Sequence, residues 1–365
     1  MLIQALQELL ESTKQNKILE LQRFGREFGF FDFSMRSKAY MVLLNITEED
    51  MELNQTALTV DLVPQNDEII LNDARRSFRE YKEMANLSQK DIEVKQADLS
   101  QILHHLFKRH KSYSYYQGLH NFAELFLMVF GKSLASLMLE RYCQKYLYLY
   151  LTNQGFEDEI KNQIYITLKI LDKELPNYKD IIGIDEDCSN GAEKLGFIVC
   201  WIVTWFSYRT KNLERIFRTF DYLMCTPRHT VSILVSLVIR QLIQRHKLLP
   251  GAEEEDVFTA FYSGDLDELN WEGMYKEATL LNELEDYGQL DYRKNKDSRL
   301  GKLVNGLKGR IQGGISMLKL SRDDNSNSKS FKDKLKAGIS KGIALGSGLF
   351  KRKESKSRSR SRDQQ

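Results

Sequence analysis

Two short stretches of the chain carry side chains suited to phosphoryl chemistry. The first contains Asp73 and Arg76 three positions apart, which places a carboxylate and a guanidinium on one face of a helix. The second contains Gln117 directly before Gly118, a pair typical of a turn or a helix start. A planar guanidinium can bridge phosphate oxygens, and a carboxamide can both accept from a water molecule and donate to it. Taken singly, each stretch is equally compatible with a structural role.

Signatures of other chemistries are missing from the sequence. The glycines at 301 and 306 are followed by Leu307, so they do not form the lysine-bearing loop that holds nucleotide phosphates. No GxSxG or HExxH motif occurs. Four histidines lie near one another in the sequence: His104, His105, His110 and His120. Because His104 and His105 are adjacent, they point to different sides of a helix, which predicts helix-surface or partly buried histidines and no metal site.

The composition is that of an ordinary globular chain. Of the 365 residues, 42% are hydrophobic and 28% are charged. The cysteines form no CxxC pair, which predicts reduced, structural thiols in a cytosolic or nuclear compartment; they are Cys143, Cys188, Cys200 and Cys225. The longest apolar run, Leu195 to Phe206, is shorter than the roughly 20 residues that span a bilayer and predicts a buried helix. The amphipathic N-terminus lacks the features of a signal peptide.

Charge is distributed unevenly along the chain. From Lys302 to Gln365 there are 17 Lys and Arg against 5 Asp and Glu, a net +12, so residues 1–301 carry −10 of the total of +2. A basic tail on an acidic body predicts attraction to an acidic membrane surface or to nucleic acid. A solvated tail that confers only solubility remains open.

The tail contains an amphipathic segment. Its apolar side chains fall on one helical stripe, with lysines mostly away from its centre; they are Phe331, Leu335, Ile339, Ile343 and Phe350. We expect a peripheral membrane contact through residues 303–353, with disorder as the alternative, because each interior glycine costs an isolated helix about 1 kcal/mol. The final Arg-Ser run resembles tracts of RNA-associated proteins, but no RRM, KH or zinc-finger pattern accompanies it, so no specific nucleic acid is expected.

Apolar periodicity predicts a mainly helical protein. The scarcity of proline, only four residues, supports this because long stretches lack turn signals. The expected helices cover 1–30, 36–44, 69–81, 97–109, 119–131, 193–208, 213–224 and 231–242. Between 143 and 151 the side chains alternate as in a strand, although the flanks are helical.

Four pieces of sequence, in this order, resemble the TBC (Rab GTPase-activating protein) family. They are Arg36, Tyr40, Leu43 and Leu44; Ile70, Asp73 and Arg76 in an IxxDxxR pattern; Tyr115, Gln117 and Gly118 in a YxQG pattern; and Trp201, Trp205 and Phe206 followed by Arg215, Ile216 and Asp221. The resemblance covers roughly residues 33–250. It implies an all-α, TBC-domain-like array of two helical subdomains with a flexible basic C-terminal tail.

The resemblance, together with the change in composition near residue 300, predicts a division into domains. Residues 1–32 form an N-terminal helix and residues 33–250 the Rab-GAP TBC domain. Residues 251–300 form C-terminal helices that pack on this domain, and residues 301–365 form the basic tail, disordered or amphipathic at a membrane surface.

The family's activity, carried over to matching positions, implies a GTPase activator that is not itself the enzyme. Arg76 and Gln117 are the implied catalytic residues, supplied in trans to a GTP-bound Rab, and Arg75 is the neighbouring competitor for the role of Arg76. The implied supporting residues are Asp73, Tyr115, Gly118 and Asn121. No cofactor of its own is implied, because the Rab holds GTP and Mg²⁺.

This sequence departs from the family pattern at three places. Tyr40 stands where Trp is usual, Asn121 where Asp is frequent, and the proline that often follows the arginine is absent. The loss of charge at Asn121 puts the support around the glutamine in question, which leaves open a catalytically weak Rab-binding scaffold. An RNA-associated helical protein that uses its Arg-Ser tail is a more remote alternative.

The sequences RRSFREY, which follows Asp73, and YYQGLHN are most similar to those of the TBC subfamily anchored at the endoplasmic reticulum. That similarity implies a role in vesicle-mediated transport between the endoplasmic reticulum and the Golgi. It also implies a cytoplasmic location, peripheral at one of these membranes.

Overall fold

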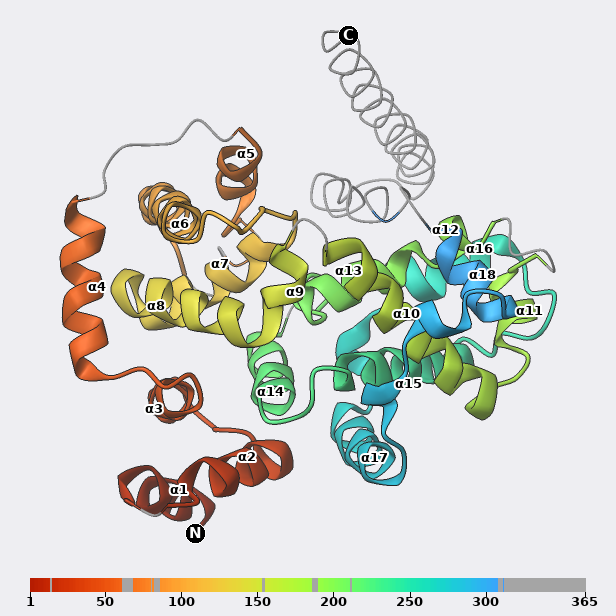
Figure 1. The fold of residues 1–365 in the computed structure, drawn as a ribbon, viewed down its shortest axis with the longest axis horizontal. Coiled ribbons are helices and arrows are strands. Elements are labelled where there is room, and N and C mark those ends of the chain that lie inside the picture. Colours follow the sequence, from red (N-terminus) through yellow and green to blue (C-terminus); the bar gives the residue numbers. More distant parts are fainter. Residues whose placement is uncertain are drawn as a thin grey trace, which may run out of the picture. The chain divides into compact units, whose positions relative to one another are not determined.

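A computed structural model describes residues 1–13, 15–60, 68–79, 81, 86–152, 155–185, 190–210, 212–307 and 311. Within these ranges every regular element is a helix, apart from one isolated antiparallel bridge between Tyr113 and Thr152 (Figure 1). The predicted all-α class is confirmed. The predicted membrane contact through residues 303–353 lies almost entirely outside the described residues. The prediction that Cys188 is a reduced, structural thiol also concerns a residue outside them.

The chain forms two compact units. Unit 1 comprises Met1–Glu159, Trp201–Gln241 and Asp265–Leu290, and unit 2 comprises Ile160–Cys200, Leu242–Gly264 and Asp291–Gln365. The chain passes between the units five times, and three of these passages lie within helices: α10 (Phe156–Glu174), α13 (Gly196–Thr204) and α15 (Thr230–Arg245). Every residue expected to do chemistry belongs to unit 1.

Besides the shared helices, unit 1 contains eleven α-helices and three short π- or 3₁₀-helices in the described part of the chain. They are α1 (Leu2–Glu11), α2 (Lys17–Phe28), α3 (Phe33–Leu43), α4 (Glu48–Val60), α5 (Glu68–Arg76), α6 (Gln89–Arg109), α7 (Leu119–Phe130), α8 (Lys132–Tyr142), η1 (Cys143–Leu147), α9 (Tyr148–Leu151), α14 (Leu213–Met224), η3 (Leu266–Glu268), α17 (Trp271–Leu284) and η4 (Tyr287–Gln289).

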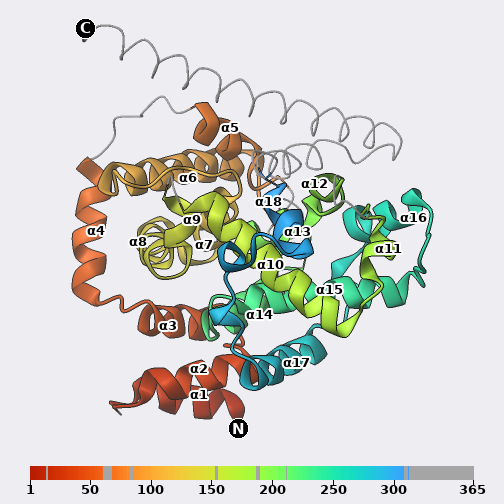
Figure 2. The same ribbon diagram turned by 45° about the vertical axis from the view of Figure 1, so that its right-hand side comes forward.

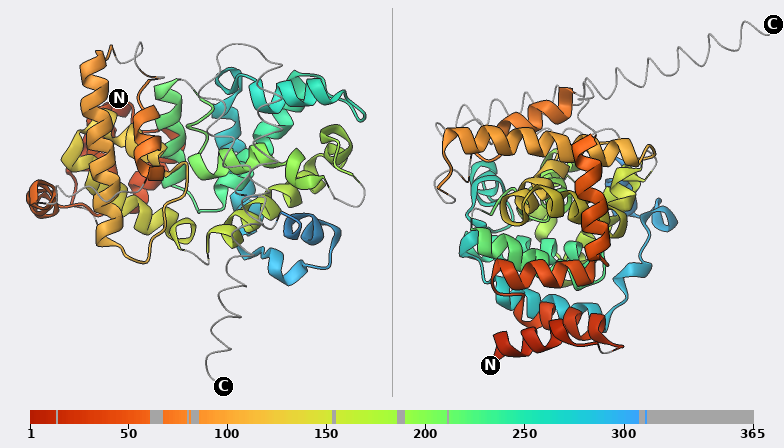
Figure 3. Two further views of the ribbon diagram at one scale, coloured as in Figure 1. Left: turned by 90° about the horizontal axis from the view of Figure 1, so that it is seen from above. Right: turned by 90° about the vertical axis from the view of Figure 1, so that its left-hand side faces the viewer.

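Helix α6 organises the half of unit 1 that carries the candidate residues. It packs against α5, α7 and α8 (Figure 2), and α4 crosses both α6 and α8 (Figure 3, right). The start of α6 is fixed by a capping box, in which Ser88 and Asp91 each accept from the other's backbone N–H. Its last turn carries Lys108 and Arg109, which complement the helix dipole.

An aromatic cluster fills the core of unit 1. Phe122 of α7 lies 5.2 Å from Tyr142 of α8 and 5.5 Å from Phe220 of α14, measured between ring centroids. Trp205 joins them, 5.2 Å from Tyr142 and 5.8 Å from Phe220. All four rings are buried. Because buried aromatic rings contribute the largest apolar areas, this cluster fixes α7 against α8 and α14. Helix α7 directly follows the loop that contains Gln117, called the glutamine loop below.

A buried ion pair joins the start of unit 1 to α14. The Arg36 guanidinium donates to Asp221 through Nε at 3.0 Å and through Nη2 at 3.1 Å. The Tyr40 hydroxyl and the Phe30 N–H donate to the same carboxylate, at 2.7 and 3.0 Å. Burial, reinforced by Asp221, raises the pKa of Tyr40 well above its usual value, so this hydroxyl stays a donor. Tyr40 therefore has a hydrogen-bonding role at a position where the resembling family has Trp.

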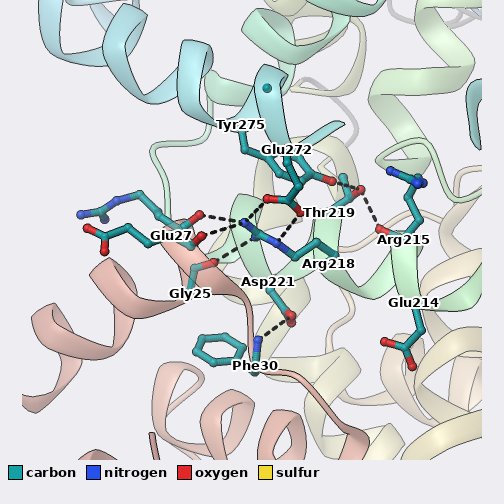
Figure 4. Close-up of polar contacts among 12 residues, drawn as sticks. Gly25, Glu27, Phe30, Glu214, Arg215, Arg218, Thr219, Asp221, Glu272 and Tyr275 are labelled. Atoms are coloured by element: carbon teal, nitrogen blue, oxygen red, sulfur yellow. Dashed lines mark hydrogen bonds and ion pairs between the residues drawn. The ribbon is translucent and has the colours of Figure 1, made fainter. Parts of the chain in front are cut away.

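Arg218 connects α2, α14 and α17 one turn before Asp221 (Figure 4). Its guanidinium donates to the carbonyl oxygens of Gly25 and Arg26 at 3.1 and 3.0 Å, at the end of α2. It also binds Glu272 at 3.1 Å and lies 4.6 Å from the centre of the Tyr275 ring. The C-terminal carbonyls of α2 thus find donors in another helix.

Unit 2 contains α11 (Tyr178–Ile182), α12 (Gly191–Lys194), α16 (Glu254–Phe258), η2 (Thr259–Ser263), η5 (Tyr292–Asn295) and α18 (Arg299–Asn305), with parts of the shared helices. Phe197 of α13 stacks on Phe261 of η2, with centroids 4.7 Å apart. Lys194 and Glu254 form an ion pair at 3.0 Å.

Four helix boundaries differ from the predictions. The helix expected over 97–109 begins earlier, at Gln89, after the capping box that starts α6. The helix expected over 1–30 is two helices, α1 and α2, because Ser12 adopts an extended conformation after α1. The helix expected to reach residue 81 ends at Arg76, and Phe78 turns left-handed. The segment 193–208 divides into parts of α12 and α13 and ends in turns. The alternating stretch 143–151 is helical, as its flanks indicated.

The described cysteines, Cys143, Cys200 and Cys225, are all buried, as expected for structural thiols, and Cys143 and Cys225 are free thiols. Burial raises the pKa of Cys143 and Cys225, which keeps both protonated and unreactive. Across the described ranges, no helix combines the length and the apolar character needed to cross a membrane.

We expect Asp221→Asn to lower the free energy of unfolding by about 3–5 kcal/mol, because it leaves the buried Arg36 guanidinium with only Glu214, an exposed carboxylate 3.9 Å away, as a counter-charge. Urea denaturation monitored by circular dichroism measures this. The matched control is Arg23→Ala, which breaks an exposed ion pair with Glu27 and should cost less than about 1 kcal/mol. Equal losses of unfolding free energy in the two variants would contradict a stabilising role for the buried Arg36–Asp221 pair.

Candidate functional site

Helix α5 presents two arginines at its C-terminal end. Ile70, Asp73 and Ala74 are buried and hold one face of the helix against the protein. Arg75 points away from this face and is exposed, whereas the side chain of Arg76 keeps an exposed fraction of 25%. Arg76 therefore lies at the boundary between the interior and the surface.

The carboxylate of Asp73 binds partners from two segments. Its Oδ1 accepts from Nη2 of Arg76, and its Oδ2 accepts from the Tyr115 hydroxyl at 2.6 Å. The Asp73 side chain has no exposed surface. A buried carboxylate is stable only when paired, so Asp73 fixes the guanidinium of Arg76 relative to the loop that contains Tyr115.

Helix α6 stabilises the end of α5. Gln96 donates from Nε2 to the carbonyl oxygens of Arg75 and Ser77, at 2.9 and 3.1 Å. The Ser77 hydroxyl donates to the carbonyl of Asp73 at 3.1 Å. These bonds satisfy carbonyls that the helix itself leaves without donors, and they hold the backbone on both sides of Arg76.

The loop before α7 is anchored on both sides of Tyr115. Ser114 donates its N–H to the carbonyl of Leu151 at 2.7 Å. The Tyr116 ring is buried and lies 5.4 Å from Phe156, and its burial raises the pKa of its hydroxyl well above the usual value. Gly118 has φ of 117° and precedes the first residue of α7, a conformation that strains any residue with a Cβ. Gln117 thus follows an anchored tyrosine and precedes an obligatory glycine.

Gln117 itself is nearly covered, with an exposed fraction of 7%. Among the described residues no hydrogen bond holds its carboxamide. The side chain is therefore packed without a polar partner that would resist a change of rotamer.

Asn121 and His120 lie in the first turn of α7, and both are buried. His120 Nδ1 lies 3.0 Å from the Tyr115 hydroxyl and 3.4 Å from Oδ2 of Asp73. Since the Tyr115 hydroxyl donates to Asp73, its oxygen can accept from His120 Nδ1–H. The other histidines have different partners: His104 bonds the Ser100 carbonyl at 2.8 Å, and His110 bonds Glu140 at 2.6 Å.

The structure therefore brings together Asp73, Arg76 and Tyr115, and adds His120 to them. The sequence pattern predicts only a helix-surface or partly buried histidine at position 120. Its only sequence signal is its place three residues after Gln117, in the first turn of a mostly apolar helix. Asp73 pairs with Arg76, whereas Arg75 is exposed on the opposite side of the helix, which favours Arg76 as the positioned arginine.

The sequence of residues 33–249 matches the Rab-GTPase-TBC domain family. This match covers more than half of the chain, and the chain belongs to that family. The predicted extent of 33–250 agrees with it.

Among its relatives is TBC1 domain family member 20 from Bos taurus, 23% identical over 232 residues, which are 62% of this chain and 54% of the relative. GTPase-activating protein gyp10 from Schizosaccharomyces pombe is 24% identical over 225 residues, 60% of this chain and 56% of that protein. The matched region thus spans about half the length of these relatives.

The fold is similar to a crystal structure of the Chlamydomonas flagellar RabGAP TBC domain. The TM-score is 0.52 with 14% identity, over 73% of this chain and 85% of the other. At this identity the likeness supports the fold, and the particular side chains rest on the contacts described above.

We expect Tyr115→Phe to lower the free energy of unfolding by about 1.5–3 kcal/mol, because the buried Asp73 carboxylate loses a hydroxyl donor. Chemical denaturation of the purified chain measures the change. Tyr148→Phe is the control, since Tyr148 is half exposed and should change stability by less than about 0.5 kcal/mol. A Tyr115→Phe variant as stable as this control would show that the hydroxyl is dispensable.

Proposed function

We propose that this protein accelerates GTP hydrolysis by a Rab-family GTPase, to which it supplies Arg76 and Gln117. Family membership supports a Rab partner. The observation that carries the residue assignment is the buried Asp73 carboxylate, which binds Arg76 of α5 and Tyr115 of the glutamine loop. The protein acts as an activator, and the reaction takes place on the nucleotide and Mg²⁺ held by the Rab.

Arg76 supplies positive charge to the transferring phosphoryl group. Phosphoryl transfer needs little covalent help, and charge stabilisation by an arginine contributed from a partner accelerates it by about 10³–10⁵. The bidentate geometry of a guanidinium suits phosphate oxygens better than a lysine ammonium does. In the protein alone, Asp73 holds Arg76 at the surface boundary, so the side chain is preorganised before the partner arrives.

Gln117 orients the attacking water. A carboxamide can accept a hydrogen bond from the water and donate one to a phosphate oxygen. Because Gln117 is 7% exposed, binding of the GTPase must be accompanied by a turn of this side chain toward the partner. Rotamer changes of this kind are common at protein interfaces.

We place the protein in vesicle traffic between the endoplasmic reticulum and the Golgi, on the cytoplasmic side. This rests on the similarity of the stretches around Asp73 and Gln117 to the endoplasmic-reticulum subfamily. A peripheral membrane contact through the basic residues 303–353 would bring the activator to a membrane-bound Rab.

Single-turnover GTP hydrolysis by a panel of GTP-loaded Rabs tests this function. We expect the wild-type chain to stimulate at least one Rab and Arg76→Ala to reduce the stimulated rate by about 10³-fold or more. Arg76→Lys should lose most of the stimulated rate as well, because a lysine ammonium cannot reproduce the bidentate geometry of the guanidinium. Gln117→Ala should also lose most of the stimulation.

The matched control is Arg75→Ala, which removes the exposed neighbour on the same helix and should leave most of the rate. A severe Arg75→Ala and a mild Arg76→Ala would transfer the role to Arg75. Tight binding of a GTP-loaded Rab without acceleration would instead support a binding scaffold, the alternative favoured by the burial of Gln117 and the loss of charge at Asn121.

A further inference from the structure

The backbone immediately after the arginine helix adopts an unusual conformation. Phe78, two residues beyond Arg76, has φ of 67° and is completely buried. A left-handed residue just past a helix is usually glycine, because a side chain is disfavoured there. For a bulky residue this conformation is an outlier that persists only when surrounding contacts enforce it.

The contact that enforces it comes from α7. The Phe78 N–H donates to Oε1 of Glu124, and the Glu124 side chain is 2% exposed. At a helix end of this kind, the amide would ordinarily bond to a carbonyl of its own helix. Here a carboxylate from another helix takes that place, and charge-assisted bonds of this type are among the stronger ones.

The same short segment is held from a second side. Gln96 of α6 donates to the Ser77 carbonyl at 3.1 Å, and Lys95 Nζ lies 6.0 Å from the centre of the Phe78 ring. Ser77 and Phe78 are thus fixed between α6 and α7, so the position at which α5 ends depends on contacts from both helices.

Glu124 also has a defined relation to the glutamine. Gln117 and Glu124 are seven positions apart, or about two helical turns, with Gly118 and the start of α7 between them. At its first turn α7 places His120 beside Tyr115 and Asp73, and one turn later it places Glu124 on the Phe78 N–H. Helix α7 therefore contacts the chain on both sides of Arg76, at Asp73 within α5 and at Phe78 just after it.

We propose that Glu124 is a positioning residue, which acts through Phe78 to fix the end of α5 and hence the direction of the Arg76 guanidinium relative to Gln117. This inference rests on the proposed function. Glu124 need not touch the GTPase, since its effect passes through the backbone two residues after Arg76.

A packing role makes a different prediction. Nine of the other residues of α7 are apolar: Leu119, Phe122, Ala123, Leu125, Phe126, Leu127, Met128, Val129 and Phe130. If Glu124 only filled space, leucine would serve as well or better, because a buried carboxylate is costly. If it positions Phe78, leucine fails and glutamine, which retains an acceptor oxygen, restores function.

The experiment compares Glu124→Leu and Glu124→Gln in single-turnover hydrolysis, at varied activator concentration, on the Rab that the wild type stimulates best. We expect Glu124→Leu to lower the maximal rate by about 10–100-fold, as misplacement of a catalytic group by about 1 Å does, with half-saturation changed less than about threefold. Glu124→Gln should remain within about threefold of wild type. Glu159→Gln, which alters a buried carboxylate paired with Arg228, is the matched control and should be neutral.

A double variant separates positioning from general damage. Because Glu124 acts through Arg76, Glu124→Leu should cause no further loss when added to Arg76→Ala. Losses that multiply would overturn the proposal, and so would a Glu124→Leu variant with the wild-type rate. A wild type that accelerates no Rab would reject the proposed function and this inference with it, whereas wild-type acceleration that requires Arg76 but not Glu124 would reject only this inference.

Hydrogen exchange of the full chain supplies a readout besides activity. The Phe78 amide should exchange faster in Glu124→Leu than in wild type, while amides within α6 keep their protection. Unchanged exchange at Phe78 would overturn the proposal, and loss of protection throughout unit 1 would assign Glu124 a global structural role instead.

Discussion

The buried carboxylate of Asp73 is the constraint on which the candidate site depends. With no exposed surface it requires partners, and it obtains them from Arg76 and from Tyr115, forty-two positions away. An isolated Asp–Arg pair on a helix surface would contribute little. Burial changes this, because the same carboxylate now determines where the guanidinium lies relative to the glutamine loop.

A comparable interaction maintains the scaffold of unit 1. Asp221 gathers Arg36, Tyr40 and the Phe30 N–H, and Arg218 on the same helix binds the end of α2. Both sets bring segments nearly two hundred positions apart into contact. The aromatic cluster around Phe122 then fixes α7 against α14, so the helix that follows Gln117 is rigid where the chemistry needs it.

The two candidate side chains, Arg76 and Gln117, differ in how much of their surface is exposed. Gln117 is nearly covered, whereas Arg76 remains one-quarter exposed. Asp73 therefore holds the arginine in place. Under the proposed function, the glutamine would turn outward when a partner binds, so that the charged group is positioned in advance and the neutral group is sheltered until the interface forms.

The sequence by itself determined the all-α class, the approximate positions of about half of the helices and the residues of the two motifs, because periodicity and spacing are local properties of the chain. It did not place α4, α8 or α10. It also singled out Arg36, Tyr40 and Asp221, without showing that Arg36 and Tyr40 both donate hydrogen bonds to the carboxylate of Asp221. Only the tertiary structure decided that α5 ends at Arg76, that His120 joins Asp73, and that Glu124 binds the Phe78 N–H. These depend on side chains from separate helices meeting in the interior, where an unpaired polar group is costly, and no local pattern specifies that meeting.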